Sequence, residues 1–220
     1  MFSALLRKDL TIEFRSKEIV ISMITFGVAV ILLYAFAFRQ SPEAFEKFSP
    51  GLLWMIFLFV SAMGVHRAFS LEKEFDAFSM LLSAPVERSA VFLSKWVSSF
   101  IFILVSQVVV VPLFLFFLQV SPPENLAGWI GIFILTDMGI AALGSLISGL
   151  VMRVRMSEIL LPMLLVPLIT PLLIAAVKST DALMTGLQFS HWRIWPQIIV
   201  TFVIAFGALG YVIFDFVSEE

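Results

Sequence analysis

The sequence predicts an all-α integral membrane protein: one transmembrane domain over residues 1–220, with six membrane-spanning helices. The composition is the first indication, because 60% of the residues are hydrophobic and only 14% are charged. Soluble domains average about 45–50% apolar and about 25% charged residues. The second indication is spacing, because a bilayer core of about 30 Å needs about 20 mostly apolar residues per helix. Six stretches approach that length: Ile19–Phe38, Pro50–Val65, Trp96–Val120, Trp129–Met152, Ile159–Val177 and Ile194–Phe216.

The second stretch is the shortest, and it reaches Ala68 if His66 and Arg67 lie at the membrane interface. Short loops are expected after the first, third and fifth spans, and the last has room for a short interfacial helix. Tryptophans near the span ends are expected to anchor the helices at the membrane surface. The three loops are Arg39–Ser49, Ser121–Gly128 and Lys178–Arg193, and the five tryptophans are Trp54, Trp96, Trp129, Trp192 and Trp195.

The distribution of Lys and Arg predicts the orientation, because cytoplasmic loops are enriched in these residues. Of the 14 Lys and Arg residues, only Arg39, Lys47, Lys178 and Arg193 fall on one side of the predicted membrane. The remaining ten precede the first span or lie between spans two and three and spans four and five. Both termini are therefore predicted to be cytoplasmic, in a multi-pass protein of an inner or plasma membrane.

Residues 1–18 form a predicted amphipathic helix at the cytoplasmic surface. Its apolar residues recur at spacings of three and four, and most of its charged residues lie elsewhere on the helical wheel. Two interpretations stay open: an ordinary anchoring extension, or an elbow helix that packs against neighbouring helices. The apolar residues are Phe2, Leu5, Leu6, Leu10 and Phe14.

Residues 66–95 are the longest polar segment and are predicted to be cytoplasmic. A solvated linker would not need so many apolar side chains, so we expect a face that is covered by lipid or by another protein. Pro85 is expected to stop or kink the helix. The apolar positions include Phe69, Phe75, Phe78 and Leu82, and the acidic ones are Glu72, Glu74 and Asp76.

The sequence lacks the residues that several kinds of binding and catalysis require. There is no cysteine, and the net charge of −2 gives no basis for a nucleic-acid partner. No glycine-rich phosphate-binding loop with a lysine is present, so the chain is not expected to bind ATP itself. His66 and His191 lie on opposite predicted membrane faces and cannot bind one metal ion together. With no nucleophile–base pair either, we expect neither a metal site nor an enzyme.

Polar groups inside the predicted spans are few. Asp137 lies in the fourth span and Gln107 in the third. A carboxylate there is costly and usually faces the bundle interior or a water-filled path. Asp137 therefore serves either a substrate pathway or a structural hydrogen bond, and a structural role is favoured for Gln107.

Two helix patterns bear on packing and movement. Ala141, Ser145 and Gly149 recur every fourth residue, and such small residues allow a second helix to approach closely. The fifth span contains three prolines, each of which removes a backbone donor. We expect these prolines to bend or break the helix, which would then be a gate or a curved wall. The prolines are Pro162, Pro167 and Pro171.

Three stretches carry a resemblance to a known family. One opens the second span, as Ser49-Pro50-Gly51-Leu52-Leu53-Trp54. One runs through the cytoplasmic segment, from Arg67 and Phe69 through Glu72, Leu81, Leu82 and Pro85 to Lys95. The third is in the fifth span, from Leu161-Pro162 through Pro167-Leu168-Ile169-Thr170-Pro171-Leu172-Leu173. In these stretches, and in size and topology, the whole chain resembles the CcmB family, the membrane permease of the haem exporter in cytochrome c maturation.

The resemblance implies an ABC-2-like permease of a bacterial inner membrane, without an ATPase domain of its own. It implies a complex with a second copy of the chain, a CcmA-like ATPase subunit that binds ATP, a CcmC-like haem-handling protein, a small CcmD-like helper and a CcmE-like haem chaperone. No tightly bound cofactor is implied, and haem is a transported or transient ligand. Energy transmission to the loaded chaperone is favoured over tight haem binding.

The resemblance also suggests roles for particular residues. Residues 1–18 become the elbow helix, and the cytoplasmic segment becomes the coupling helix that enters a groove of the ATPase. Pro162, Pro167 and Pro171 become the bent helix. His191 and Trp192 are candidate haem contacts. The expected coupling residues are Glu72, Glu74, Phe75, Asp76, Phe78, Leu81, Leu82 and Pro85.

Three alternatives stay open. The chain could be an ABC-2 permease for a lipid, a polysaccharide or a drug. It could be a membrane enzyme that uses Asp137, which is the strongest intramembrane polar candidate. It could also be a purely structural subunit of the assembly.

Overall fold

A computed structural model describes residues 2–39, 42–74, 87–151 and 157–217. Within these ranges the regular structure is entirely helical. The helices are α1 Phe2–Ser16, α2 Glu18–Ala37, α3 Pro42–Glu74, α5 Arg88–Leu118, α6 Leu126–Val151, α7 Ser157–Met184, α8 Phe189–Trp192 and α9 Ile194–Val217.

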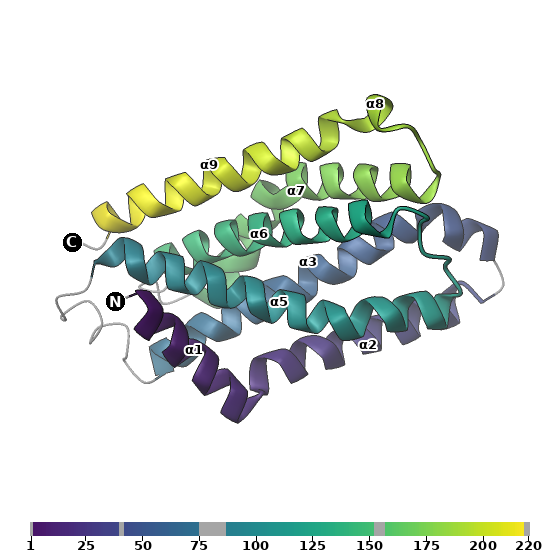
Figure 1. Ribbon diagram of the computed structural model, residues 1–220. Helices are drawn as coiled ribbons and strands as arrows, with labels where there is room; N and C mark the ends of the chain where they lie inside the picture. Colours follow the sequence, from purple (N-terminus) through teal and green to yellow (C-terminus); the bar gives the residue numbers. More distant parts are fainter. Residues whose placement is uncertain (1, 40–41, 75–86, 152–156, 218–220) are drawn as a thin grey trace.

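The six long helices run side by side, and α1 lies at an angle across one end of the bundle (Figure 1). Both termini lie at that end, which we call the terminal end, and α8 marks the opposite end, the α8 end. The central element is α6, which contacts α3, α5, α7 and α9 and is the most deeply buried of the six long apolar helices.

The six predicted spans are confirmed as helices long and apolar enough to cross a membrane. The second does extend beyond Val65, since its apolar part ends at Phe69. The apolar parts are Glu18–Ala37, Phe45–Phe69, Arg88–Leu118, Leu126–Val151, Met163–Met184 and Ile194–Phe214.

Two predicted loops are shorter than expected. The helix α3 already begins at Pro42, so most of the predicted Arg39–Ser49 turn is helical. The helix α7 continues to Met184, because the polar residues after Val177 find partners inside the bundle. Ser179 donates to the carbonyl of Ala175 over 2.8 Å, and Trp54 donates from Nε1 to the Thr180 hydroxyl over 2.9 Å. The short helix expected in that loop is α8.

The prediction that tryptophans anchor the surface is wrong for Trp54, Trp129 and Trp192, which are buried. Trp54 stacks on Phe133 with 4.9 Å between ring centroids, and Trp129 meets the same ring edge-on at 5.0 Å. These rings fill the space between α3 and α6 because aromatic side chains bury large areas and pack well in offset or edge-on geometries.

The small residues of α6 allow the close helix contact that their spacing predicted. Ala141 and Ser145 are completely buried. A Cβ atom at Gly149 would overlap the ring of Phe214 on α9, and one at Gly144 would come 3.1 Å from Val65 on α3. The absence of side chains therefore sets how closely α6 approaches both neighbours.

The prolines of the fifth span do not break it. The helix α7 is continuous across Pro162, Pro167 and Pro171, so the predicted break is wrong. A proline has no N–H for the carbonyl four residues earlier. The carbonyls of Met163 and Pro167 therefore lack their usual helical donors, although the helix continues through them.

Candidate functional sites at the two ends of the bundle

The helix α1 packs against α5 and α2, as the elbow interpretation predicted. Of the predicted apolar face, Leu5 and Leu10 are partly buried against the core. Asp9 and Glu13 are its buried side chains, whereas Phe14 is 78% exposed. Apolar side chains at a membrane surface can be covered by lipid, but buried carboxylates need partners within the protein.

Asp9 pairs with Lys95 near the start of α5. The Nζ atom of Lys95 lies 3.1 Å from each carboxylate oxygen of Asp9, and both side chains are less than 10% exposed. The same Nζ lies 5.6 Å from the centre of the Phe69 ring on α3, within cation–π range. One buried ammonium group therefore contacts α1, α3 and α5 at the terminal end.

Glu13 closes the connection between α1 and α2. Its carboxylate accepts hydrogen bonds from the backbone N–H groups of Ile19 and Val20, at 3.3 and 2.8 Å. The first N–H groups of a helix have no partner within that helix, so this carboxylate caps α2 and complements its dipole. Lys17 makes the turn in the left-handed region, with φ of 55°.

A second ion pair at the terminal end joins Glu18, at the start of α2, to Arg67 near the end of α3. Both side chains are more than one third exposed. The pair is worth little for stability by itself, since exposed pairs contribute about 0–1 kcal/mol. It nevertheless brings the first turn of α2 to the part of α3 that precedes residues 75–86.

Most of the predicted coupling residues lie outside the described part of the chain. These are Phe75, Asp76, Phe78, Leu81, Leu82 and Pro85. Glu72 and Glu74 fall in the last turns of α3, where only the backbone is described. Phe69 was expected on a face covered by lipid or by another protein, but it is buried within the chain against Val65 and Lys95.

Asp137 and Gln107, which the sequence singled out separately, form a pair in the middle of the bundle. Gln107 donates from Nε2 to Oδ1 of Asp137 over 2.7 Å, between α5 and α6. Asp137 is fully buried, and Gln107 is 5% exposed. Within the described residues, Oδ2 of Asp137 has no hydrogen-bond partner. The contact is a hydrogen bond of the kind that the structural alternative for Asp137 requires, and the substrate-pathway alternative stays a prediction.

Replacing Gln107 by leucine should lower the stability of the chain by about 1–2 kcal/mol, because a buried acceptor loses its donor. Asp137→Asn should cost less, since an amide oxygen can still accept from Gln107. Thermal unfolding of the purified variants in detergent measures both changes. An Asp137→Asn chain of normal stability that produced no c-type cytochromes would instead favour a functional role for Asp137, in a substrate pathway or in a membrane enzyme.

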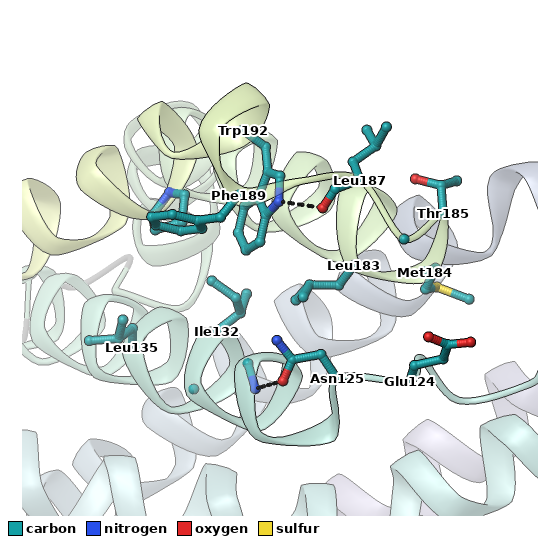
Figure 2. A pocket seen from close by; sticks show the side chains of 14 residues that line it. Glu124, Asn125, Ile132, Leu135, Leu183, Met184, Thr185, Leu187, Phe189 and Trp192 are labelled. Atoms are coloured by element: carbon teal, nitrogen blue, oxygen red, sulfur yellow. Dashed lines mark hydrogen bonds between the residues drawn. The ribbon is translucent and has the colours of Figure 1, made fainter.

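A cavity of about 710 Å³ opens at the α8 end, between the first turns of α6, the end of α7, the following loop and the start of α9. Figure 2 shows the ring of Trp192 above Ile132 and Leu183, with Asn125 and Glu124 on the opposite side. Trp192 donates from Nε1 to the carbonyl of Leu187 over 3.2 Å. The other lining residues are Gly128, Gly131, Leu135, Met184, Thr185, Gly186, Phe189 and Pro196.

The structure separates the two candidate haem contacts. Trp192 lines the cavity, whereas His191 is exposed and is not among its lining residues. The Nδ1 atom of His191 lies 3.4 Å from the hydroxyl of Ser190. In the described residues, no three His, Asp or Glu side chains gather as they would to bind a metal ion.

Sequence reasoning missed the roles of Asp9, Glu13 and Lys95 in the contacts at the terminal end. Only Glu13 had a local signal, since an acidic residue shortly before an apolar helix can cap it. Asp9 and Lys95 are 86 residues apart, and no spacing rule connects them.

Six long apolar helices, with α1 docked across their terminal end, place the chain among multi-pass integral membrane proteins. Comparison with known families gives a more specific result. The family model described as CcmB protein matches residues 1–214. The chain belongs to the CcmB family.

Curated relatives agree with this assignment. The chain is similar to heme exporter protein B of Pseudomonas aeruginosa, with 24% identity over 195 residues that cover 89% of this chain and 87% of the relative. It is also similar to heme exporter protein B of Escherichia coli K12, with 25% identity over 95 residues, or 43% of each chain.

Proposed function

We propose that the chain is the permease subunit of a haem exporter in c-type cytochrome biogenesis, and that it works with a separate ATPase subunit. The family match over residues 1–214 is the observation that carries this proposal. The curated relatives are named heme exporter protein B, and the six apolar helices fit a permease. ATP is bound by the partner subunit, and haem is the transported or transiently held molecule.

The terminal end faces the cytoplasm in this proposal, and the α8 end faces the opposite side of the inner membrane. The unequal distribution of Lys and Arg supports this orientation. Residues 66–95 then contact the CcmA-like ATPase, with Phe75, Phe78 and Leu82 as its principal apolar contacts.

Contacts at the terminal end support a role in energy transmission. Phe69 on α3 and Lys95 on α5 lie on the two helices that flank residues 75–86. The ammonium group of Lys95 contacts both the Phe69 ring and the carboxylate of Asp9 on α1. A movement of α3 or α5 would therefore displace the Lys95 contacts that join α1, α3 and α5. The proline-containing α7 is the proposed moving wall, with Pro167 and Pro171 as the sites of weakened backbone hydrogen bonding.

The proposed assembly contains a second copy of the chain, a CcmC-like protein, a CcmD-like helper and a CcmE-like chaperone. Release of the haem-loaded chaperone is the proposed step driven by ATP. In this mechanism the chain acts by rigid-body movement and needs no catalytic residue.

Co-purification with the cognate ATPase tests this proposal. A Phe75→Ala, Phe78→Ala, Leu82→Ala variant should reach the membrane but lose both the ATPase and c-type cytochromes, because its apolar contact surface is removed. The matched control is Leu33→Ala, Phe36→Ala, Phe116→Ala, which removes equivalent side chains that are exposed near the α8 end. The control should retain both.

Two results would contradict parts of the proposal. A wild-type chain that brings down no ATPase would refute the permease assignment. A chain that retains the ATPase, but whose deletion leaves c-type cytochromes unchanged, would point to an ABC-2 permease for another substrate.

A further inference from the structure

A smaller cavity, of about 230 Å³, lies at the terminal end between α1, α2 and α5. Figure 1 shows α1 turning away from the axis of α2, and α5 contacts both of these helices. The angle between α1 and α2 leaves a space beside α5 that is lined by apolar side chains, apart from Glu13 and Lys17. The docking of α1 therefore creates a pocket as well as the contacts described above.

The size and walls of this pocket suit a hydrocarbon chain. It is smaller than the about 300–1,000 Å³ of pockets that hold drug-sized molecules. It is larger than an apolar cavity of about 150 Å³ that stays dry and binds benzene. Leu10, Val20 and Phe102 contribute walls from three different helices, and their side chains offer water no hydrogen bond. An apolar occupant is therefore favoured over water.

The pocket opens toward the surface that the membrane covers. Ile21 on α2 and Val105 on α5 line it, and both belong to helices long and apolar enough to span a membrane. Ile21 is 56% exposed and Val105 is 46% exposed. Exposed apolar side chains of such helices lie against lipid acyl chains, so a lipid has direct access to the pocket.

One cation marks the polar end of the pocket. Lys17, in the turn between α1 and α2, is exposed and lines the pocket. In the described part of the chain no carboxylate forms an ion pair with Lys17. The carboxylate of Glu13 is buried and accepts the backbone N–H groups of Ile19 and Val20. A lysine at the membrane surface can bury its stem in apolar surroundings and keep its ammonium group among the lipid headgroups.

We propose that this pocket binds one phospholipid per chain, with an acyl chain between α1, α2 and α5 and the phosphate at the ammonium group of Lys17. The lipid adds apolar contact between α1 and the two spans, beside the polar contacts that Asp9 and Glu13 make. The inference rests on the membrane-spanning fold and does not depend on what the chain transports.

Native mass spectrometry of the full chain, released from detergent with phosphatidylglycerol added in steps, tests the site. The wild type should retain one lipid per chain at a lower concentration than any further lipid. Val105→Trp should weaken this first binding by at least about tenfold, because the indole fills the pocket and the loss of only two buried methylene contacts corresponds to that factor. The matched control is Val108→Trp, since Val108 is on the same helix, is 75% exposed and does not line the pocket. It should retain the first lipid as the wild type does.

A second filling variant, Val20→Phe, guards against misfolding of Val105→Trp or an indole that turns away from the pocket. Val20 is partly buried, so a larger side chain there must occupy the space. Unchanged retention of the first lipid in both Val105→Trp and Val20→Phe would overturn the site. An equal loss in Val108→Trp would overturn it too, since the lipid would then belong to the general lipid shell.

Comparison with diacylglycerol of the same acyl chains tests the phosphate contact. The wild type should bind phosphatidylglycerol more tightly, and Lys17→Gln should reduce this preference about threefold, within the range of an exposed ion pair. Arg15→Gln is the matched control, because Arg15 is an exposed cation of α1 that does not line the pocket. Equal binding of the two lipids by the wild type would refute the phosphate contact. Tighter retention of oleate than of phosphatidylglycerol would overturn the choice of a phospholipid.

Discussion

Replacement of Lys95 by methionine should destabilise the chain by about 3–5 kcal/mol, because it removes the buried counter-charge of the Asp9 carboxylate and leaves only the partly exposed Lys8 beside it. Asp9 is 9% exposed and Lys95 is 3% exposed, so water can replace little of the lost interaction. Asp9→Leu should be comparably harmful, since it removes the carboxylate that lies 3.1 Å from the buried ammonium group of Lys95. Unfolding of the purified chain by heat, or by SDS titration in mixed micelles, measures the loss.

The double variant Asp9→Leu, Lys95→Met provides the decisive comparison. With both charges removed, the uncompensated burial disappears, and most of the lost stability should return. Lys8→Met is the matched control, because Lys8 contacts the same carboxylate at 3.3 Å but is 35% exposed. It should change the stability by less than about 1 kcal/mol. A double variant no more stable than the single variants would show that the ion pair itself stabilises the fold.

Gly210→Leu should have the second large effect, a destabilisation of at least about 1–3 kcal/mol through overpacking. A side chain at Gly210 would overlap the ring of Phe92, which is fully buried on α5. That ring cannot move freely, because it packs against Phe214 at 5.6 Å and Trp96 at 5.9 Å between centroids. Thermal unfolding of the purified chain measures the change.

Gly51→Leu on α3 serves as the control, because a Cβ there meets no atom within 4 Å. A double variant offers a further check. Adding Phe92→Leu to Gly210→Leu should restore part of the lost stability, because the smaller side chain at position 92 makes room for the new leucine. If Gly210→Leu were as stable as Gly51→Leu, α5 and α9 would not be held as closely as the structure has them.

The six spans were predictable because the bilayer imposes a minimum length on each apolar helix, whatever its neighbours are. The span ends were less predictable where polar residues have partners within the protein. Thr180 follows an apolar run and reads as the start of a loop, yet Trp54 binds it inside the bundle. For α7, local proline chemistry predicted a bend or a break, and the break is wrong because the helix is continuous over Ser157–Met184.

The candidate sites were predictable only in part. Asp137 and Gln107 stood out because polar side chains are rare within a span, and their pairing follows from the need of a buried carboxylate for a donor. The periodicity of α1 located an apolar stripe but could not show which of its residues pack against protein, as Leu5 and Leu10 do, and which stay exposed, as Phe14 does. The cavity at the α8 end depends on Gly131, Met184 and Trp192 from three different helices, and no local pattern brings these together.

The buried pair between Asp9 and Lys95 also constrains the order in which the polypeptide is built into the membrane. Glu13 can cap α2 as soon as the first span has been synthesised, because its partners are only six and seven residues away. Asp9 must wait for a lysine that the ribosome adds 86 residues later. Until then, the Asp9 carboxylate of the N-terminal helix has only the neighbouring, partly exposed Lys8 as a counter-charge, which suits the membrane surface but not the bundle interior. Docking of this helix is therefore a post-insertion event that marks the arrival of the third span.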